Sequence, residues 1–206
     1  MTGTFPPGAT SGPSGSAHDA AFVEALRRRE SWALAQMFDR YRREVERVLI
    51  GMLGPDSEVS DVTQDVFVRA IRSVHKFRGE APALRRWLVQ IAVRAAKNRF
   101  RHLHSRPWLR SREADPREQE PQGPSVSPEV VDALHRTYAV VSTLPDAERL
   151  VFTLRVLERM ALPEVADACG ISVATVKRRV AKATKKFEQR AARDPVLRAW
   201  IEGRPA

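Results

Sequence analysis

The sequence predicts an all-α fold made of two small helical domains that a flexible linker joins. Apolar residues recur at three- and four-residue steps along most of the chain, which is the period of amphipathic helices. No segment shows the alternation of a half-buried strand. Prolines and charges interrupt the helical pattern over residues 105–127, which we expect to form the linker. The domains are expected at residues 18–104 and 128–193, with tails at 1–17 and 194–206.

The composition indicates a basic, folded protein with an anionic partner. The 206 residues are enough for two small domains, and the formal net charge is +10. A hydrophobic content of 43% provides for real cores and excludes a disordered basic protein. Cys169 is the single cysteine, so an internal disulfide and a cysteine-based metal site are excluded. Its helical spacing predicts a packed small side chain and not a nucleophile.

The sequence carries no targeting or membrane signal that we can identify. No apolar run approaches the roughly 18 residues of a membrane span. Residues 1–17 contain no Lys or Arg and are rich in Gly, Pro, Ser and Thr, which argues against a secretory signal and predicts a disordered tail. We therefore expect a cytoplasmic protein without membrane insertion.

The first domain is expected to begin with three helices. The first covers about residues 19–29, Ser31 can cap the second, and Gly54 with Pro55 ends it. Ser60 opens the third. The positions expected in the core are Phe22, Val23, Ala25, Leu26, Met37, Tyr41, Val45, Val48, Met52, Val62, Val66, Phe67, Ala70, Ile71 and Val74. The third helix leaves four side chains to solvent or to a partner: Asp61, Gln64, Asp65 and Arg69.

A loop from Phe77 to Pro82 leads into a fourth helix over about residues 83–104, because Gly and Pro punctuate the chain there. The apolar face of this helix consists of Leu84, Leu88, Ile91, Ala92 and Ala95. No acidic residue stands between Glu80 and Glu113. The cations that accumulate in this interval are Arg85, Arg86, Arg94, Lys97, Arg99, Arg101, Arg106, Arg110 and Arg112, with Trp87 and Phe100 among them. This pattern is typical of a nucleic-acid surface, although Trp87 itself is expected in the core.

The second domain begins near Pro128. Its first helix should be lined by Val130, Leu134, Tyr138 and Val141, and its second by Leu150, Val151, Leu154 and Leu157 after Leu144-Pro145-Asp146. Asp194-Pro195 ends the last long helix. The amphipathic tail that follows carries Trp200, which we expect to dock on a neighbouring surface.

Residues 162–187 give the strongest local signal, a helix-turn-helix. Pro163 suits a first turn, Gly170 provides a left-handed helix end, and Ser172 can cap the next helix. The buried stripe of this second helix is expected at Val173, Val176, Val180, Ala183 and Phe187. Its opposite face holds Thr175, Lys177, Arg178, Arg179, Lys182, Lys185 and Lys186. A solvated helix normally mixes such cations with Glu, but no acid occurs from Cys169 to Phe187. A helix that enters a DNA major groove is therefore favoured over a surface hairpin.

Motifs in both domains together resemble one protein family. They are Asp61 to Ala70 (Asp-Val-Thr-Gln-Asp-Val-Phe-Val-Arg-Ala), Phe77 to Ala81, Leu84 to Leu88, Leu144-Pro145, and Thr175 to Arg179. In this order, over roughly residues 19–193, the chain resembles an extracytoplasmic-function (ECF, group IV) sigma factor of bacterial RNA polymerase. The resemblance implies that the first domain is region 2 and the second region 4. It also implies core RNA polymerase, promoter DNA and an anti-sigma factor as partners, with no catalytic residue, metal or cofactor.

The resemblance assigns a role to each exposed surface. A coiled coil of the largest polymerase subunit would bind Asp61, Gln64, Asp65 and Arg69. The loop from Lys76 to Pro82 would hold a base flipped from the non-template strand of the −10 element. The implied −10 contacts are Lys76, Arg78, Arg94, Lys97, Asn98 and Arg101, and the implied −35 contacts are Ser172, Thr175, Lys177, Arg178, Arg179, Lys182 and Lys186. The chain has Arg178 where the family commonly has a small Ser. A donor able to pair with guanine would change the −35 preference.

Two other function classes stay open at this stage. A helix-turn-helix regulator that binds DNA without joining polymerase would need a sensing domain, and the first half shows no such pattern. An enzyme acting on nucleic acid would need a catalytic cluster. His102 and His104 are two apart on a helix and point to different faces, and Asp61 and Asp65 have no third acid with which to hold Mg²⁺.

Overall fold

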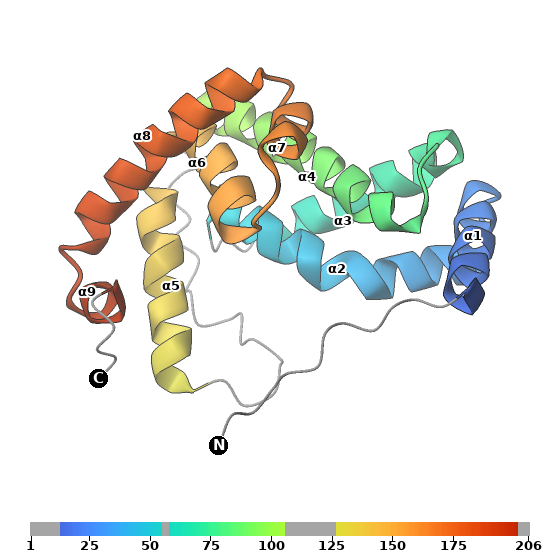
Figure 1. The fold of residues 1–206 in the computed structure, drawn as a ribbon, viewed down its shortest axis with the longest axis horizontal. Coiled ribbons are helices and arrows are strands. Elements are labelled where there is room, and N and C mark those ends of the chain that lie inside the picture. Colours follow the sequence, from blue (N-terminus) through green and yellow to red (C-terminus); the bar gives the residue numbers. More distant parts are fainter. Residues whose placement is uncertain (1–12, 55–57, 106–126, 202–206) are drawn as a thin grey trace.

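The computed structural model describes residues 13–54, 58–105 and 127–201, and its elements in these ranges are helical, without a strand (Figure 1). The first domain contains α1 (Pro13–Arg27), α2 (Ser31–Leu53), α3 (Val59–Ser73), the 3-10 turn η1 (Val74–Lys76) and α4 (Ala81–Ser105). The second contains α5 (Pro128–Ser142), α6 (Asp146–Phe152), the π-helical turn η4 (Thr153–Leu157), α7 (Leu162–Cys169), α8 (Val173–Ala191) and α9 (Pro195–Ile201). The all-α prediction is confirmed.

Some helix starts differ from the expected ones. Helix α1 begins at Pro13, six residues before the expected start and inside the segment 1–17 that was expected to be a disordered tail. The residue before α2 is Glu30, in extended conformation, so Ser31 is the first helical residue and not its cap. Helix α4 begins at Ala81 and includes Pro82 in its first turn, where the missing N–H needs no partner. The preceding loop is therefore shorter than the sequence suggested. Gly54 ends α2 as expected, with a φ of 93° that favours glycine.

The core of the first domain forms where α2, α3 and α4 pack together and α1 closes one end. The apolar faces predicted for these helices are largely confirmed. Buried side chains include Phe22 and Leu26 on α1, Met37, Tyr41, Val45, Val48 and Met52 on α2, Val66, Phe67 and Ala70 on α3, and Leu84, Leu88, Ile91, Ala92 and Ala95 on α4. The amphipathic pattern thus identified the inner face of each helix.

The apolar lining of the second domain is confirmed in part. Val141 is buried with Leu144, Phe152 and Ala183, but Val130 and Leu134 at the start of α5 are exposed. Helix α5 contacts α2, α8 and α9 and leaves this part of its apolar stripe uncovered.

Two further expectations for the end of the chain are wrong. Val173 is exposed because it is the first residue of α8, and the buried stripe starts one turn later at Val176. Trp200 is also exposed, and the buried Leu197 is the side chain that docks α9.

The two domains pack directly against each other. Helix α7 lies against α4, and α6 with η4 lies beside α2 (Figure 1). Leu150, Leu154 and Val165 belong to the same buried cluster as the core residues of α2 and α4. Most of the expected linker, residues 106–126, lies outside the described residues, so its mobility stays a prediction. The sequence pattern had given no sign of a shared core.

Candidate nucleic-acid interface

The turn between α7 and α8 has the geometry that its sequence predicts. Gly170 is left-handed, with φ 64° and ψ 42°. The N–H of the next residue, Ile171, donates to the carbonyl of Ala166 at 3.0 Å, which satisfies an otherwise free helix end. The Ser172 hydroxyl accepts from the backbone N–H of Thr175 at 3.2 Å and caps α8. These local bonds fix the direction in which α8 leaves the turn.

Helix α8 has one buried face and one cationic face. Val176 and Ala183 are buried, and the half-buried Phe187 stacks on Phe152 with ring centroids 5.0 Å apart. On the opposite side Lys177 and Arg178 are exposed, and within the described part of the chain neither makes a hydrogen bond or an ion pair. These two side chains can therefore receive an anionic partner without first breaking a hydrogen bond or an ion pair.

Two predicted DNA-contacting lysines on α8 are engaged by an acid from α6. The buried Glu148 accepts from Lys186 Nζ at 2.7 Å and lies 3.3 Å from Lys182 Nζ. Burial alone would raise the pKa of Glu148, but the hydrogen bonds from both lysines outweigh it and hold the pKa below its ordinary value. Lys182 remains mostly exposed, whereas Lys186 is half-buried and oriented toward α6. Lys186 is consequently the less accessible of the two to a phosphate.

The loop before α4 is held by an arginine from α1. Arg27 donates to the carbonyls of Phe77 at 3.0 Å and Gly79 at 3.1 Å. A Cβ on Gly79 would lie 2.6 Å from the Phe77 ring, so the loop requires glycine there. The half-buried Trp87 packs on Phe77 with ring centroids 5.3 Å apart. This scaffold keeps the predicted contacts Lys76 and Arg78 exposed at the rim of the loop, and Arg78 donates to the carbonyl of His75 at 2.9 Å.

Three arginines of α4 are paired with acids and do not contribute to an open cationic surface. Arg85 bonds Glu44 on α2 and Glu158 of the second domain. Arg86 lies 3.9 Å from Glu164 on α7, and Arg99 pairs with Glu58. Arg94 differs, because it is exposed and no described residue forms an ion pair with it. Of the basic run, Arg94 thus fits a DNA contact best.

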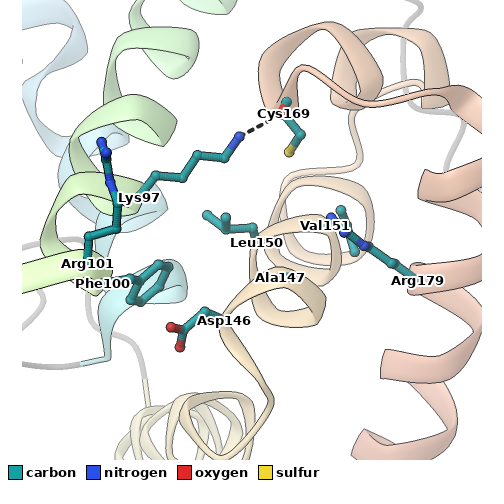
Figure 2. Close-up of a pocket in the computed structure, with 9 residues that line it drawn as sticks. All are labelled: Lys97, Phe100, Arg101, Asp146, Ala147, Leu150, Val151, Cys169 and Arg179. Atoms are coloured by element: carbon teal, nitrogen blue, oxygen red, sulfur yellow. Dashed lines mark hydrogen bonds between the residues drawn. The ribbon is translucent and has the colours of Figure 1, made fainter. Parts of the chain in front are cut away.

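Three predicted DNA contacts meet at a pocket between the domains. Lys97 and Arg101 on α4 and Arg179 on α8 line a cavity of about 390 Å³ together with Phe100 and Leu150 (Figure 2). Lys97 Nζ donates to the carbonyl of Cys169 at 2.5 Å, and Arg101 bonds the amide of Asn98. In this arrangement Lys97 faces the second domain and not solvent.

Cys169 itself is buried, and burial raises the pKa of its thiol although Lys97 and Arg179 act in the opposite direction. A neutral packed thiol agrees with the structural role expected from its spacing.

A separate exposed face lies on α3. Asp61, Gln64, Asp65 and Arg69 are all exposed, and Arg69 Nη2 lies 3.6 Å from Asp65 Oδ2. Val68, which sequence analysis did not single out, is exposed among them at helical spacing. The face therefore has an apolar side chain within a polar rim, as many protein interfaces do.

No other kind of site stands out in the described ranges. They contain no cluster of three or more His, Cys, Asp or Glu side chains that could hold a metal ion. Nor does any helix in these ranges have the length and apolar character needed to cross a membrane.

Comparisons with known proteins agree with both halves of this description. Residues 37–106 match the family described as Sigma-70 region 2, and residues 134–187 match Sigma-70, region 4. The ECF RNA polymerase sigma-E factor of Haemophilus influenzae is 28% identical over 187 residues, covering 84% of this chain and 94% of that protein. The sigma-E factor of Escherichia coli (strain K12) is 28% identical over 193 residues, covering 87% and 96%. The chain belongs to the ECF sigma factors.

A solved structure shares the fold of this sigma factor. CnrH, in complex with the cytosolic domain of CnrY, matches with a TM-score of 0.61 at 22% identity, covering 85% of this chain and 98% of that one. The region 2 match runs from inside α2 to just past α4, and the region 4 match runs from α5 into α8. Helices α1 and α9 of the sigma factor lie outside both matches.

Proposed function

We propose that this sigma factor binds core RNA polymerase through α3 and directs it to promoters, with α8 reading the −35 element and α4 and its preceding loop contacting the −10 element. The observation that carries this proposal is the exposed pair Lys177 and Arg178 on the outer face of α8, the second helix of a well-capped helix-turn-helix. Family membership supports the role in transcription initiation. The protein acts as a non-catalytic subunit in the cytoplasm, where promoter DNA is located.

The chemistry of α8 divides into base reading and phosphate binding. Arg178 is the candidate base reader, because its planar fork can pair with guanine O6 and N7 in the major groove. Lys177 and Lys182 flank it and suit phosphates, which position the helix without reading sequence. Ser172 and Thr175 lie at the N-terminus of α8, where backbone N–H groups also attract phosphate. Arg179 and Lys186 could join them only after leaving their present surroundings.

The chemistry of region 2 uses two surfaces of opposite character. Asp61 and Asp65 on α3 can accept charge-assisted hydrogen bonds from basic residues of a polymerase coiled coil, while Val68 supplies apolar contact. Lys76, Arg78 and Arg94 are exposed and suit the phosphates of the −10 strand. Lys97, Asn98 and Arg101 remain expected −10 contacts once region 4 moves away. An anti-sigma factor remains an expected partner.

Run-off transcription with purified core polymerase on a randomised promoter library tests the proposal. The sigma factor should yield specific transcripts that share −35 and −10 sequences, and core enzyme alone should yield none. A protein that binds DNA but neither associates with core polymerase nor yields transcripts would instead be a regulator outside polymerase.

A further inference from the structure

We propose that the packed arrangement of regions 2 and 4 is a closed, autoinhibited state of this sigma factor, latched by Glu158. This inference rests on the proposed function, because closure matters only if both regions must bind DNA. Four observations carry it: an ion-pair network, a close backbone contact, the contact of Lys97 with the helix-turn-helix and the exposure of α3.

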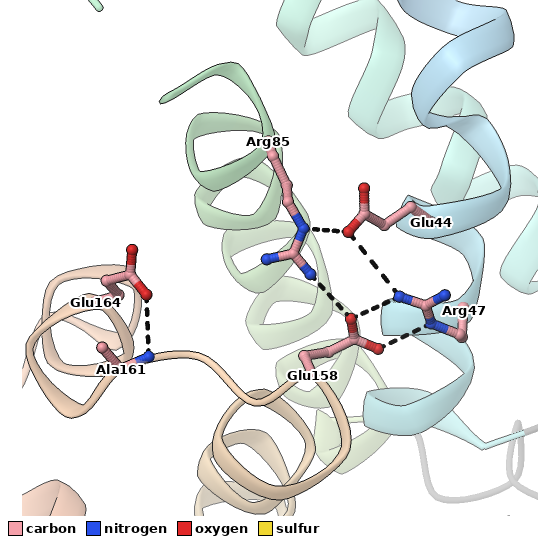
Figure 3. Close-up of polar contacts among 6 residues, drawn as sticks. All are labelled: Glu44, Arg47, Arg85, Glu158, Ala161 and Glu164. Atoms are coloured by element: carbon pink, nitrogen blue, oxygen red, sulfur yellow. Dashed lines mark hydrogen bonds and ion pairs between the residues drawn. The ribbon is translucent and has the colours of Figure 1, made fainter. Parts of the chain in front are cut away.

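The latch is a carboxylate of the second domain held by arginines of the first. The Glu158 side chain is 3% exposed and accepts from Arg47 Nε at 3.0 Å and Arg47 Nη2 at 2.8 Å (Figure 3). It also accepts from Arg85 Nη2 at 3.1 Å. Glu44 on α2 pairs with the same two arginines and balances their second charge. A buried carboxylate needs such partners, so separating the domains removes the partners of Glu158.

The contact is fitted at the level of the backbone. Thr153 Oγ1 donates to the carbonyl of Gly51 at 2.7 Å across the interface. A Cβ at Gly51 would lie 2.6 Å from Thr153 Cγ2, so glycine allows η4 to approach α2 this closely. Glycine within a helix disfavours the helix itself, which makes the packing role the better explanation of this residue. Gln90 on α4 adds a 2.5 Å bond to Asp167 on α7.

Closure prevents the two DNA surfaces from working together. Lys97 touches the carbonyl of Cys169, so the −10 helix is in contact with the helix-turn-helix. Elements centred about 25 base pairs apart are separated by roughly 85 Å along the duplex at about 3.4 Å per base pair. The chain between residues 105 and 128 can span about 80 Å when fully extended, so the domains can separate by tens of ångströms without breaking it.

The closed state leaves the polymerase surface accessible. Asp61, Gln64 and Asp65 on α3 are exposed while the domains are packed. Core polymerase can therefore engage region 2 first and favour the open state, because a ligand with higher affinity for one conformation shifts the population toward it. Opening exposes Leu150, Leu154 and Val165, and this cost keeps the free protein closed.

The experiment measures the distance between spin labels on α2 and α8 in the free, full-length protein. Labels are attached at Gln36→Cys and Gln189→Cys, both exposed, in a Cys169→Ala background. The protein with Glu158 intact should give a single short distance. Glu158→Gln should lower the ratio of closed to open molecules by about ten- to a hundredfold, so that longer distances appear. We expect this range because Arg47 and Arg85 keep access to water, which weakens the pairs relative to fully buried ones. The matched control is Glu188→Gln, the same chemical change at an exposed position of α8, and it should leave the distances unchanged.

Two readouts keep this test separate from the proposed function. Glu158→Gln should also raise transcription at limiting polymerase and leave it unchanged at saturating polymerase. A wide, long distance distribution in the protein with Glu158 intact, or a short distance that persists in Glu158→Gln, would overturn the latch even if transcription is normal. If Glu158→Gln loses its helical circular dichroism, Arg47→Gln decides by the same distances, because Arg47 is the more exposed partner. Absence of specific transcripts from every variant would contradict the proposed function, while the distances would still report on closure.

Discussion

Helices α4 and α8 are both strongly basic, yet their cations face different surroundings. On α8, Lys177 and Arg178 are exposed, and their side chains make no hydrogen bond or ion pair with other described residues. On α4, Arg85 and Arg86 are paired with acids that lie outside α4. A run of positive charge in the sequence can therefore have either of two roles in the fold. One helix presents a surface to an external anion, and the other uses much of its charge to hold the two regions together.

The largest effect is expected on α3, where the side chains proposed to bind a partner are acids and not cations. Replacing Asp61 and Asp65 together by Lys should weaken core polymerase binding by about 2–5 kcal/mol, since charge pairing with the partner becomes repulsion. Both side chains are exposed, so the free energy of unfolding should change little. Competition for core enzyme against the unmodified sigma factor measures the effect. Normal competition by the double variant would remove α3 from the polymerase interface.

The pairing of Glu148 with the lysines of α8 can be tested by its effect on stability. Glu148→Gln should lower the free energy of unfolding at pH 7 by about 1–2 kcal/mol, because it removes the charge that Lys186 and Lys182 face. The folded-state pKa of Glu148 is depressed, so its contribution is present above the unfolded pKa and is lost as pH falls through the lower, folded value. Urea unfolding of the unmodified protein and of Glu148→Gln from pH 7 to pH 3 measures the effect, and the difference between their free energies of unfolding should shrink toward pH 3. A difference in free energy of unfolding that does not change with pH would mean that the ion pairs of Glu148 contribute nothing to stability.

Arg94 and Arg99 provide the smallest and most selective test within α4. Arg94→Ala should reduce the log–log salt slope of promoter binding by roughly one and leave the free energy of unfolding nearly unchanged, because Arg94 is exposed. Arg99→Ala should do the reverse and lower stability by about 1 kcal/mol, because Arg99 is mostly buried beside Glu58. Holoenzyme binding at several salt concentrations and thermal unfolding distinguish the two. Equal salt slopes for the two variants would contradict the assignment of Arg94 to DNA binding and Arg99 to stability.

Sequence reasoning succeeded where the controlling interactions are local. Gly170 and Ser172 act within a few residues of themselves, so their types and spacing were enough to predict the helix-turn-helix. Helical periodicity likewise identified buried positions such as Met37 and Leu88. The exposed positions of α3 followed from the same pattern.

Sequence reasoning could not find contacts between residues that are distant along the chain. Arg85 and Glu158 are separated by 73 positions, and nothing in either neighbourhood indicates the other. Glu148 lies outside the acid-free run that predicted an open cationic helix, so its pairing with Lys186 was not foreseen. For the same reason Lys97 was expected to face DNA, whereas here it faces region 4. Charge signs were readable from the sequence, but the partner of each charge was set by tertiary packing.

The measurement that tests the central claim most directly is holoenzyme binding across a −35 substitution series at several salt concentrations, with Arg178→Ala compared with Lys177→Ala. Arg178→Ala should cost about 1–3 kcal/mol on the preferred −35 element and relax preference at one or two positions. Lys177→Ala should weaken binding evenly on all sequences and reduce the salt slope by roughly one. If Arg178→Ala lowers affinity equally at every −35 sequence, Arg178 binds phosphate, and the assignment of α8 as the base-reading helix through this residue is contradicted.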